Sequence, residues 1–308
     1  MIGILYGLIP FIFITFLGFT FGKLKILDLK HAKNLNLFLY YIAVPALIIQ
    51  LIVQNEIELV DYKQTLSYLI MQSICGVITY LVIFKYFKRP IPESIIWALT
   101  VTLSNHVTLL LPITEIFFQK DVITQVATII LIDSVILLSI VTFLLEFSIK
   151  KNIKVFFFIK NLFLNPIILS ILVGIFFLML NFNIDKSPID YTLSKLAACV
   201  SPVGLFAIGI ILSFYSQNII NKFSVLISFI KLIISPIILL LIGLIIFNLR
   251  LPAEIPGAFF VSVAPCGVTS IVLCAAYNVS PENIIKAIFL STVLSIGTIF
   301  FAIKYLTL

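Results

Sequence analysis

Two short stretches, one in each half of the chain, place polar and helix-breaking residues inside otherwise apolar surroundings. The first is Ser104-Asn105-His106-Val107-Thr108, followed by Pro112, and the second is Ala264-Pro265-Cys266-Gly267-Val268-Thr269-Ser270. An interruption in a helix leaves free backbone amides and about half a positive charge at the start of the next half-helix. If the two interruptions meet in a low-dielectric interior, their amide ends would bind an anion.

The side chains of these stretches supply the candidate binding groups. Asn105 and Thr108 offer hydrogen bonds, and Gly267 lets the backbone come close to a ligand. The alternative is that the prolines and polar residues only kink two packed helices, but their matched places in the two halves favour a site. The predicted substrate-binding residues are Asn105, His106, Thr108, Pro265, Cys266, Gly267, Val268, Thr269 and Ser270.

Ionisable residues within apolar stretches are further candidates, because a charge at the centre of a bilayer is costly. Asp133 is the outstanding one, and we predict that it carries a proton coupled to substrate movement. A structural pair with Lys231 explains it equally well, and a neutral hydrogen-bonded acid is a third alternative. His106 is expected to touch substrate or a proton, whereas Glu115 suits a position near the membrane surface.

Other kinds of chemistry lack the residues that they need. The four cysteines lie in apolar runs without paired spacing, so neither disulfides nor a metal site is predicted, and no cofactor is expected. An intramembrane lipid-modifying enzyme or protease is a remote alternative, because His31 and His106 are the only histidines and no H-E-x-x-H motif occurs. The sequence also lacks the G-x-x-x-x-G-K-[ST] phosphate loop of ATP-driven proteins. We therefore predict that the protein is not an enzyme.

The composition indicates that these residues are positioned by membrane helices. Hydrophobic residues make up 62% of the 308 residues and charged residues only 11%, unlike a soluble protein. Backbone groups in lipid must bond within helices, so the ten apolar runs predict an all-α membrane protein with a single integral membrane domain over 1–308. The runs cover 2–22, 35–53, 64–84, 94–118, 122–149, 162–181, 191–214, 224–248, 255–275 and 283–306.

The basic residues predict the orientation of these ten spans. Most lysines and arginines fall in the odd-numbered loops, which the positive-inside rule assigns to the cytoplasm. Both termini are then predicted on the non-cytoplasmic side, and the first run is expected to remain as a span. The net charge of +7 is explained in this way, so no nucleic-acid partner is expected. Abundant Ile, Phe, Lys and Asn are consistent with an AT-rich bacterial genome, and we predict a location in a bacterial inner membrane.

Paired features recur at a separation close to half the chain length, which predicts an internal repeat. Pro10 in the first run matches Pro166 in the sixth, and Asn105 falls opposite Pro265. Five spans per half make the second repeat enter the membrane from the side opposite to the first, which gives a 5+5 inverted repeat. The two repeats are predicted at 1–150 and 161–308.

Several segments resemble the auxin efflux carrier family, which includes bacterial malonate and malate permeases and plant auxin carriers. The resembling segments are Pro265-Cys266-Gly267-Val268, Tyr277-Asn278-Val279-Ser280-Pro281, Asn165-Pro166 and Ser201-Pro202-Val203-Gly204-Leu205-Phe206-Ala207-Ile208-Gly209. Asn105 followed by Pro112 is similar to the signature of the fourth helix, although Val107 and Leu110 stand where the family usually has glycine. The resemblance spans the whole chain and is strongest from residue 162 onward.

The resemblance implies a ten-helix carrier with a scaffold from helices 1, 2, 6 and 7 and a transport core from helices 3–5 and 8–10. The substrate would bind where broken helices 4 and 9 cross, and transport would use elevator-like alternating access. Bile-acid sodium symporters share this architecture, so a sodium-coupled symporter is the alternative within transport.

The predicted function is secondary active transport of a small organic anion. A mono- or dicarboxylate such as malate, malonate or an auxin-like acid fits, with a coupling proton or sodium ion and the lipid bilayer as the other partners. A sensor or receptor would need a signalling domain, for which no residues remain. The oligomeric state stays open, with a homodimer among the candidates.

Overall fold

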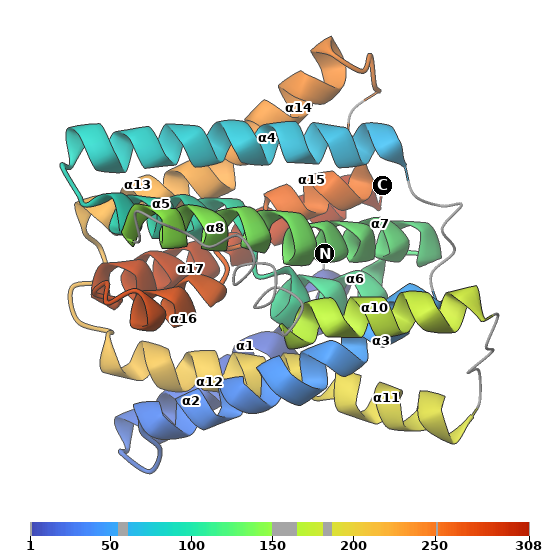
Figure 1. The fold of residues 1–308 in the computed structure, drawn as a ribbon, viewed down its shortest axis with the longest axis horizontal. Helices are drawn as coiled ribbons and strands as arrows, with labels where there is room; N and C mark the ends of the chain where they lie inside the picture. The colour runs from blue at the N-terminus through green and yellow to red at the C-terminus, as the bar shows by residue number, and fades with distance from the viewer. Residues whose placement is uncertain (1, 55–60, 150–164, 181–186, 251, 308) are drawn as a thin grey trace.

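The computed structural model describes residues 2–54, 61–149, 165–180, 187–250 and 252–307, and most of them are helical (Figure 1). Within these ranges the helices and their connecting turns are accompanied by one isolated antiparallel bridge. The predicted all-α fold is therefore confirmed.

The helices of the first half are α1 (Ile2–Lys23), α2 (Leu29–Phe38), α3 (Val44–Gln54), α4 (Tyr62–Leu81), α5 (Ile91–Thr102), α6 (Leu111–Phe117), α7 (Lys120–Ile132) and α8 (Leu138–Ile149). Those of the second half are α10 (Pro166–Met179), α11 (Pro188–Ala198), α12 (Val200–Phe214), α13 (Lys222–Phe229), α14 (Ser235–Ile245), α15 (Pro256–Ser262), α16 (Thr269–Ala276) and α17 (Glu282–Leu306). Wider π-helical turns join or extend some of them: η1 (Leu39–Ala43), η3 (Val82–Tyr86), η4 (His106–Leu110), η5 (Asp133–Leu137) and η6 (Ile230–Ile234).

Three of these π turns have a common cause in the sequence. Turns η1, η4 and η6 each end two residues before a proline, namely Pro45, Pro112 and Pro236. A proline ring has no N–H and clashes with the carbonyl four residues earlier in an α-helix. The extra residue of a π turn moves that carbonyl away, so each helix continues through its proline instead of ending there.

Seven helical stretches are long and apolar enough to cross a membrane. Three shorter apolar helices, over residues 91–102, 106–117 and 166–179, accompany them in the described ranges. Two of the short helices belong to the predicted span 94–118, which is broken in the middle, and the predicted span 255–275 is likewise divided into α15 and α16. The predicted span 162–181 is described only from residue 165 to residue 180.

Helices α1, α2, α3, α10, α11 and α12 form one packed group, in the lower part of Figure 1. Helix α1 packs along α12, and α3 packs against α10 and α11. Glycines make the first of these contacts close: a Cβ atom added at Gly18 would lie 2.1 Å from the carbonyl oxygen of Phe206, and one added at Gly209 equally close to that of Thr15. Small residues commonly bring membrane helices together in this way.

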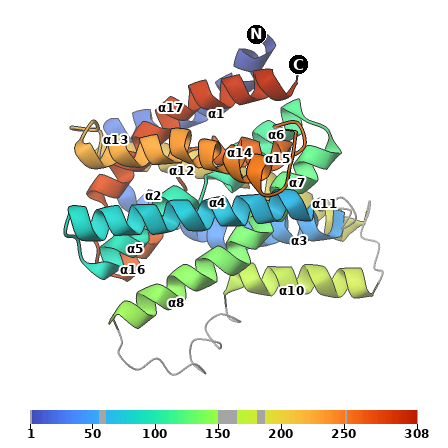
Figure 2. The same cartoon turned by 90° about the horizontal axis from the view of Figure 1, so that it is seen from above.

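The remaining helices form a second packed group above the first. Helix α4 packs against α5 and α14, α13 against α17, and α15 against α7. Figure 2 shows α4 lying across this group, with α8 and α10 at its outer side and the ends of α1 and α17 near each other. The largest fully buried side chains of the molecule include Tyr68, Trp97, Lys231 and Phe260, which all belong to this second group.

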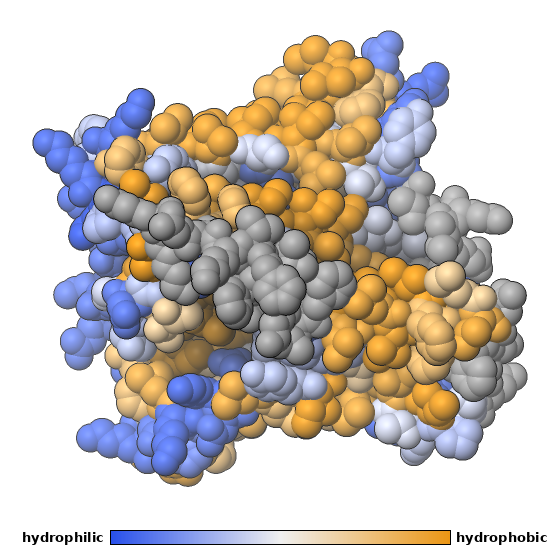
Figure 3. Space-filling view, in the orientation of Figure 1, coloured by the Kyte–Doolittle hydropathy of each residue, from blue (hydrophilic) through white to orange (hydrophobic). Residues whose placement is uncertain are grey.

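The described surface matches a membrane-spanning arrangement. In the view of Figure 3, hydrophobic side chains cover much of the described surface between the left and right edges, and hydrophilic side chains gather at the left edge and at the upper right. The connections from α1 to α2, from α4 to α5 and from α12 to α13 lie at the left edge. All three connections are odd-numbered loops in the predicted order of spans, and the first two carry lysines and an arginine.

Candidate functional site

The predicted break in the fourth span lies between α5 and η4. Helix α5 ends at Thr102, and Leu103 then takes an extended conformation with φ −82° and ψ 122°. Helical geometry resumes only after Asn105, at His106. Ser104 and Asn105 favour such an interruption because their side chains compete with the helix for backbone hydrogen bonds.

The predicted break in the ninth span lies between α15 and α16. Helix α15 ends at Ser262 and α16 begins at Thr269, so six residues separate the two half-helices. Pro265 lies within this connection, where it cannot donate the hydrogen bond that a continuous helix would need.

The two breaks meet and pair as short extended strands. Ser104 and Cys266 form an isolated antiparallel bridge. The amide of Asn105 donates to the carbonyl oxygen of Pro265 at 2.9 Å, and the amide of Gly267 donates to that of Leu103 at 2.7 Å. These bonds satisfy backbone groups that the breaks would otherwise leave buried without partners. The interruption of both helices and their crossing therefore agree with the expectation from sequence.

Gly267 is required at this crossing by simple lack of space. A Cβ atom added at Gly267 would lie 2.9 Å from the carbonyl oxygen of Leu103, closer than side-chain carbons approach in folded proteins. The same backbone contact carries the short hydrogen bond between these two residues. Glycine permits the close approach because it has no side chain.

The half-helices that follow the crossing begin with free amides. The first backbone amides of η4, from His106 to Thr108, make no hydrogen bond within the described part of the chain, and the same holds for Thr269 and Ser270 at the start of α16. Such amides carry the positive end of a helix dipole. The crossing thus places two positive helix ends in the interior, where an anion is the natural ligand.

Asn105 and Thr108 lie together at the start of η4. The Thr108 hydroxyl donates to Oδ1 of Asn105 across one turn, which leaves the NH₂ group of Asn105 outside this bond. Thr108 also packs against α12, since a Cβ atom added at Gly204 would lie 2.6 Å from its methyl group. This part of the site therefore borders the first packed group of helices.

Asp133 is fully buried and accepts hydrogen bonds from three side chains. Tyr68 donates its hydroxyl to Oδ2 at 3.0 Å, Gln72 donates Nε2 to Oδ1 at 2.7 Å, and Nε2 of His106 lies 3.0 Å from Oδ2. Gln72 also donates to the carbonyl oxygen of Thr102, at the end of α5. The Asp133 carboxyl group is therefore connected to both sides of the break, to Thr102 through Gln72 and to His106 by its own hydrogen bond.

Lys231 reaches the crossing from the opposite side. Its ammonium group donates to Oγ of Ser104 at 2.6 Å, and that hydroxyl in turn donates to the carbonyl oxygen of Val261 at 3.1 Å. Because α5 and α15 both end here, Lys231 lies where two negative helix ends converge. Among the described residues, the structure gives Lys231 and Asp133 no direct ion pair; Tyr68 contacts both Asp133 and Ser104 and so links the two ends.

The other predicted residues have simpler surroundings. The amide of Cys266 donates to Oγ of Ser291 at 3.2 Å, and Ser270 donates its hydroxyl to the carbonyl oxygen of Gly267. Val268 is partly buried and packs against the hydrophobic core. Glu115 is exposed near the end of α6, and its position at the membrane surface stays a prediction.

Sequence reasoning missed three participants on or beside this network: Tyr68, Gln72 and Ser104. A signal for the first two was present in α4, where Gln64, Tyr68 and Gln72 recur at a spacing of four residues and all are buried. Residues spaced by four lie on one face of a helix, and a polar face in an apolar helix points to a polar interior.

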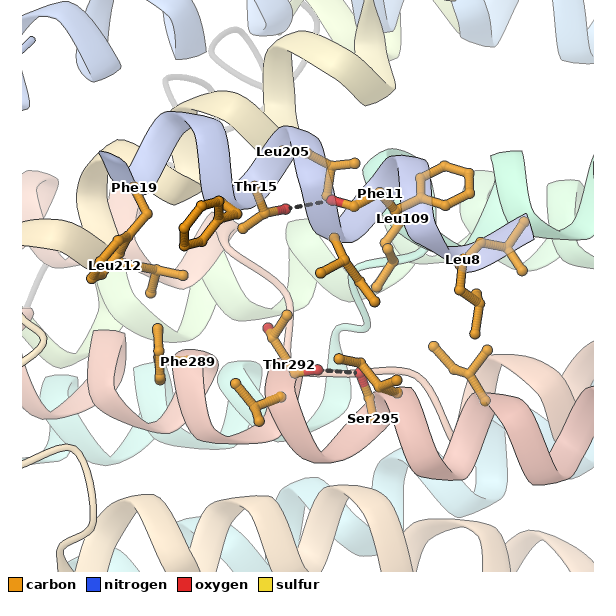
Figure 4. A pocket seen from close by; sticks show the side chains of 16 residues that line it. Leu8, Phe11, Thr15, Phe19, Leu109, Leu205, Leu212, Phe289, Thr292 and Ser295 are labelled. Atoms are coloured by element: carbon orange, nitrogen blue, oxygen red, sulfur yellow. Dashed lines mark hydrogen bonds between the residues drawn. The ribbon is translucent and has the colours of Figure 1, made fainter. Parts of the chain in front are cut away.

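A pocket of about 260 Å³ lies between the two packed groups. Figure 4 shows Phe11 and Thr15 of α1 facing Thr292 and Ser295 of α17 across it. The Thr15 and Ser295 hydroxyls donate to carbonyl groups of their own helices, so the lining is apolar in character. Leu109 of η4 joins this lining, which brings the pocket next to the half-helix that begins at the crossing.

Comparison with known proteins identifies the class of protein that this fold and crossing define. A family model described as membrane transport protein matches residues 4–303, so the chain belongs to that family, whose members are transporters of the auxin efflux carrier type. None of the curated proteins that were compared matches the chain. The protein is therefore a membrane transporter.

Proposed function

We propose that the protein is a secondary active transporter of a small organic anion, a mono- or dicarboxylate such as malate, malonate or an auxin-like acid. The observation that carries this proposal is the backbone-paired crossing of Leu103–Asn105 with Pro265–Gly267, from which two half-helices start with free amides. Two positive helix ends in a low-dielectric interior favour a ligand with a compact negative charge.

Each of the two strands at the crossing, with the half-helix that follows it, is assigned a different kind of anion-binding group. On the first side, Asn105, His106 and Thr108 provide polar side chains at the start of η4. On the second side, the backbone of the segment from Pro265 to Ser270 provides the amides, with Gly267 keeping the two strands close. The proposed binding residues on this second side are Pro265, Cys266, Gly267, Val268, Thr269 and Ser270.

Transport requires the site to face each side of the membrane in turn, and we assign this to an elevator-like movement. We assign the scaffold, helices 1, 2, 6 and 7, to the first packed group and the transport core, helices 3–5 and 8–10, to the second, and the packing of the helices into two groups supports this division. The pocket between α1 and α17 supports a movable boundary there, because its described lining is mainly apolar and its Thr15 and Ser295 hydroxyls bond within their own helices. The ten-span, 5+5 inverted repeat is part of this proposal, although the junction at residues 150–161 lies outside the described residues.

Location and orientation follow from the basic loops. We assign the protein to a bacterial inner membrane, with the odd-numbered loops in the cytoplasm and both termini outside. The shared position of the loops after α1 and α4 at one edge of the molecule supports this orientation.

We assign the energy coupling of anion transport to proton movement, and we assign Asp133 to the group of residues that takes part in it. The side-chain groups that face Asp133 are a phenol hydroxyl, an amide NH₂ and an imidazole nitrogen. A sodium ion needs several oxygen acceptors around it, whereas these groups supply hydrogen-bond donors. Lys231 also occupies the negative helix ends where a bound cation would otherwise be stabilised.

Uptake of labelled organic acids into proteoliposomes tests this function. Wild-type protein should accumulate at least one of malate, malonate, lactate and indole-3-acetate under an imposed proton gradient. Asn105→Ala should lower the initial rate about tenfold or more, because a hydrogen bond to a charged ligand contributes on the order of 1.5–3 kcal/mol. Asn34→Ala, at an exposed position of α2, is the matched control. Equal rates in Asn105→Ala and the control would remove the crossing from the binding site.

A further inference from the structure

The two ring nitrogens of His106 have different surroundings. Nε2 lies 3.0 Å from Oδ2 of Asp133, and both side chains are buried. Nδ1 is also buried but has no hydrogen-bond partner in the described part of the structure. Buried polar atoms are normally paired, so a lone unpaired nitrogen in a membrane interior indicates a missing partner.

The pairing with Asp133 decides which nitrogen is free to change its state. When Asp133 is ionised it can only accept hydrogen bonds, and Nε2 of His106 then carries the proton of this hydrogen bond. The neutral ring then has a bare lone pair on Nδ1. Because Nδ1 is bonded to Cγ, it lies on the side of the ring near its own main chain, at the start of η4 where the free amides begin.

The groups around His106 have a balanced charge before any ligand binds. Lys231 on η6 and Asp133 on η5 are a base and an acid that Tyr68 and Ser104 link, and the ionised form of this pair has no net charge. The other titratable groups that face this network are the Tyr68 phenol and the thiols of Cys75 on α4 and Cys266 at the crossing, all of which are ordinarily neutral near pH 7. With a neutral His106, the network carries no net charge.

We propose that a proton on Nδ1 of His106 accompanies each monocarboxylate through the membrane, so that transport is an electroneutral proton–anion symport. This inference rests on the proposed function and names its coupling group and charge stoichiometry. The proton adds one positive charge to the balanced network, and the single carboxylate adds one negative charge. The imidazolium Nδ1–H then donates to the carboxylate and so gains the partner that it lacks when the site is empty.

The same balance disfavours a fully ionised dicarboxylate. Its second carboxylate would leave one uncompensated negative charge on the loaded site as it crosses the membrane interior. Lactate and malate make a matched pair of probes, because both are 2-hydroxy acids and they differ by one carboxylate. At pH 7.5, exchange of labelled for unlabelled lactate should be at least about tenfold faster than exchange of labelled for unlabelled malate. A tenfold ratio of rates corresponds to about 1.4 kcal/mol of free energy.

The wild-type protein alone provides the first test. Three driving forces are imposed on proteoliposomes, each alone. They are a pH difference with the outside either more alkaline or more acidic than the inside, a potassium diffusion potential of either sign set with valinomycin, and a sodium gradient. An outside pH one unit more acidic than inside should drive about tenfold lactate accumulation. Neither potential nor sodium gradient should drive any. Uptake that follows the potential or the sodium gradient would overturn the inference, and so would faster exchange of malate than of lactate.

A neutral replacement provides the second test. His106→Gln keeps a hydrogen-bonding side chain next to Asp133 but cannot gain a charge. Lactate accumulation under the pH step should fall from about tenfold to none, while exchange of labelled for unlabelled lactate continues at a reduced rate. His31→Gln is the matched control, because His31 is the other histidine and is exposed. Retained pH-driven accumulation in folded His106→Gln would show that the proton is carried elsewhere.

These measurements separate failure of the inference from failure of the proposed function. If none of lactate, malate, malonate and indole-3-acetate exchanges across liposomes that contain folded wild-type protein, organic-anion transport itself is wrong and the inference is overturned with it. If one of them exchanges but its accumulation responds to potential, only the proton–monocarboxylate stoichiometry is wrong. The potential measurement needs no variant, so it decides the inference even where His106→Gln does not fold.

Discussion

The two strands that cross at the centre of this transporter have the same backbone role and very different side chains. Lys231 donates to Ser104 of the strand from Leu103 to Asn105, and His106, which directly follows this strand, is hydrogen-bonded to Asp133. The strand from Pro265 to Gly267 has only a proline ring, a thiol and a glycine. A pair of broken helices can therefore share a geometry while one member holds the charged groups and the other supplies close backbone packing.

The largest expected effect comes from breaking the charged network on the first strand. Lys231→Met should lower the free energy of unfolding by about 3–5 kcal/mol, because Asp133 then lacks its balancing cation in the interior. Thermal unfolding of the purified protein in detergent measures this loss. The double variant Lys231→Met/Asp133→Asn should lose less than the sum of the two single losses. Strict additivity would show that the two charges do not compensate each other.

Crowding the second strand should have the next largest effect. Gly267→Ala places a methyl group against the backbone of Leu103, which cannot move without separating the crossing, and should cost about 1–3 kcal/mol and most of the transport activity. Gly297→Ala is the matched control, since a Cβ atom there meets nothing within 4 Å. Equal unfolding temperatures for the two variants would contradict the tight backbone contact at Gly267.

A smaller effect is expected from the hydroxyl group of Thr108. Thr108→Val keeps the packing against Gly204 but removes the hydrogen bond to Asn105, and should cost about 1 kcal/mol in stability and raise the KM for the transported anion several-fold. Thr100→Val, whose hydroxyl donates to the carbonyl of Ile96 one turn earlier, is the control. An unchanged KM in Thr108→Val would show that Asn105 does not need the hydrogen bond from Thr108 in order to bind the anion.

The smallest effect is expected at a polar side chain after the second strand. Ser270 donates to the carbonyl oxygen of Gly267 and has no bond to the charged network in the described structure. Ser270→Ala should change the free energy of unfolding by less than about 0.5 kcal/mol and the uptake rate by less than about twofold. A loss as large as that of Asn105→Ala would mean that side chains of the second strand also contact the anion.

The breaks were predictable because they depend on local chemistry. Pro265 lacks the N–H that a continuous helix needs and Gly267 has a low helix propensity, while the side chains of Ser104 and Asn105 compete for backbone hydrogen bonds shortly before Pro112. The π turns before Pro45, Pro112 and Pro236 follow from the same steric clash, but sequence alone favours a kink and a π turn equally. The connection of Lys231 to Ser104 gave no sequence signal, since the two residues lie in different helices and far apart in the chain.

The sequence by itself determined that this protein is an all-helical membrane transporter with two interrupted helices, because apolar runs in lipid must be helical and prolines must break or distort them. Only the tertiary structure decided which groups meet at the interruptions. The hydrogen bonds of Asp133 to Tyr68, Gln72 and His106 arise because packing brings three separate helices together around one carboxyl group. Once buried there, a charge cannot remain without partners, so the packing of the helices also determined the chemistry of the site.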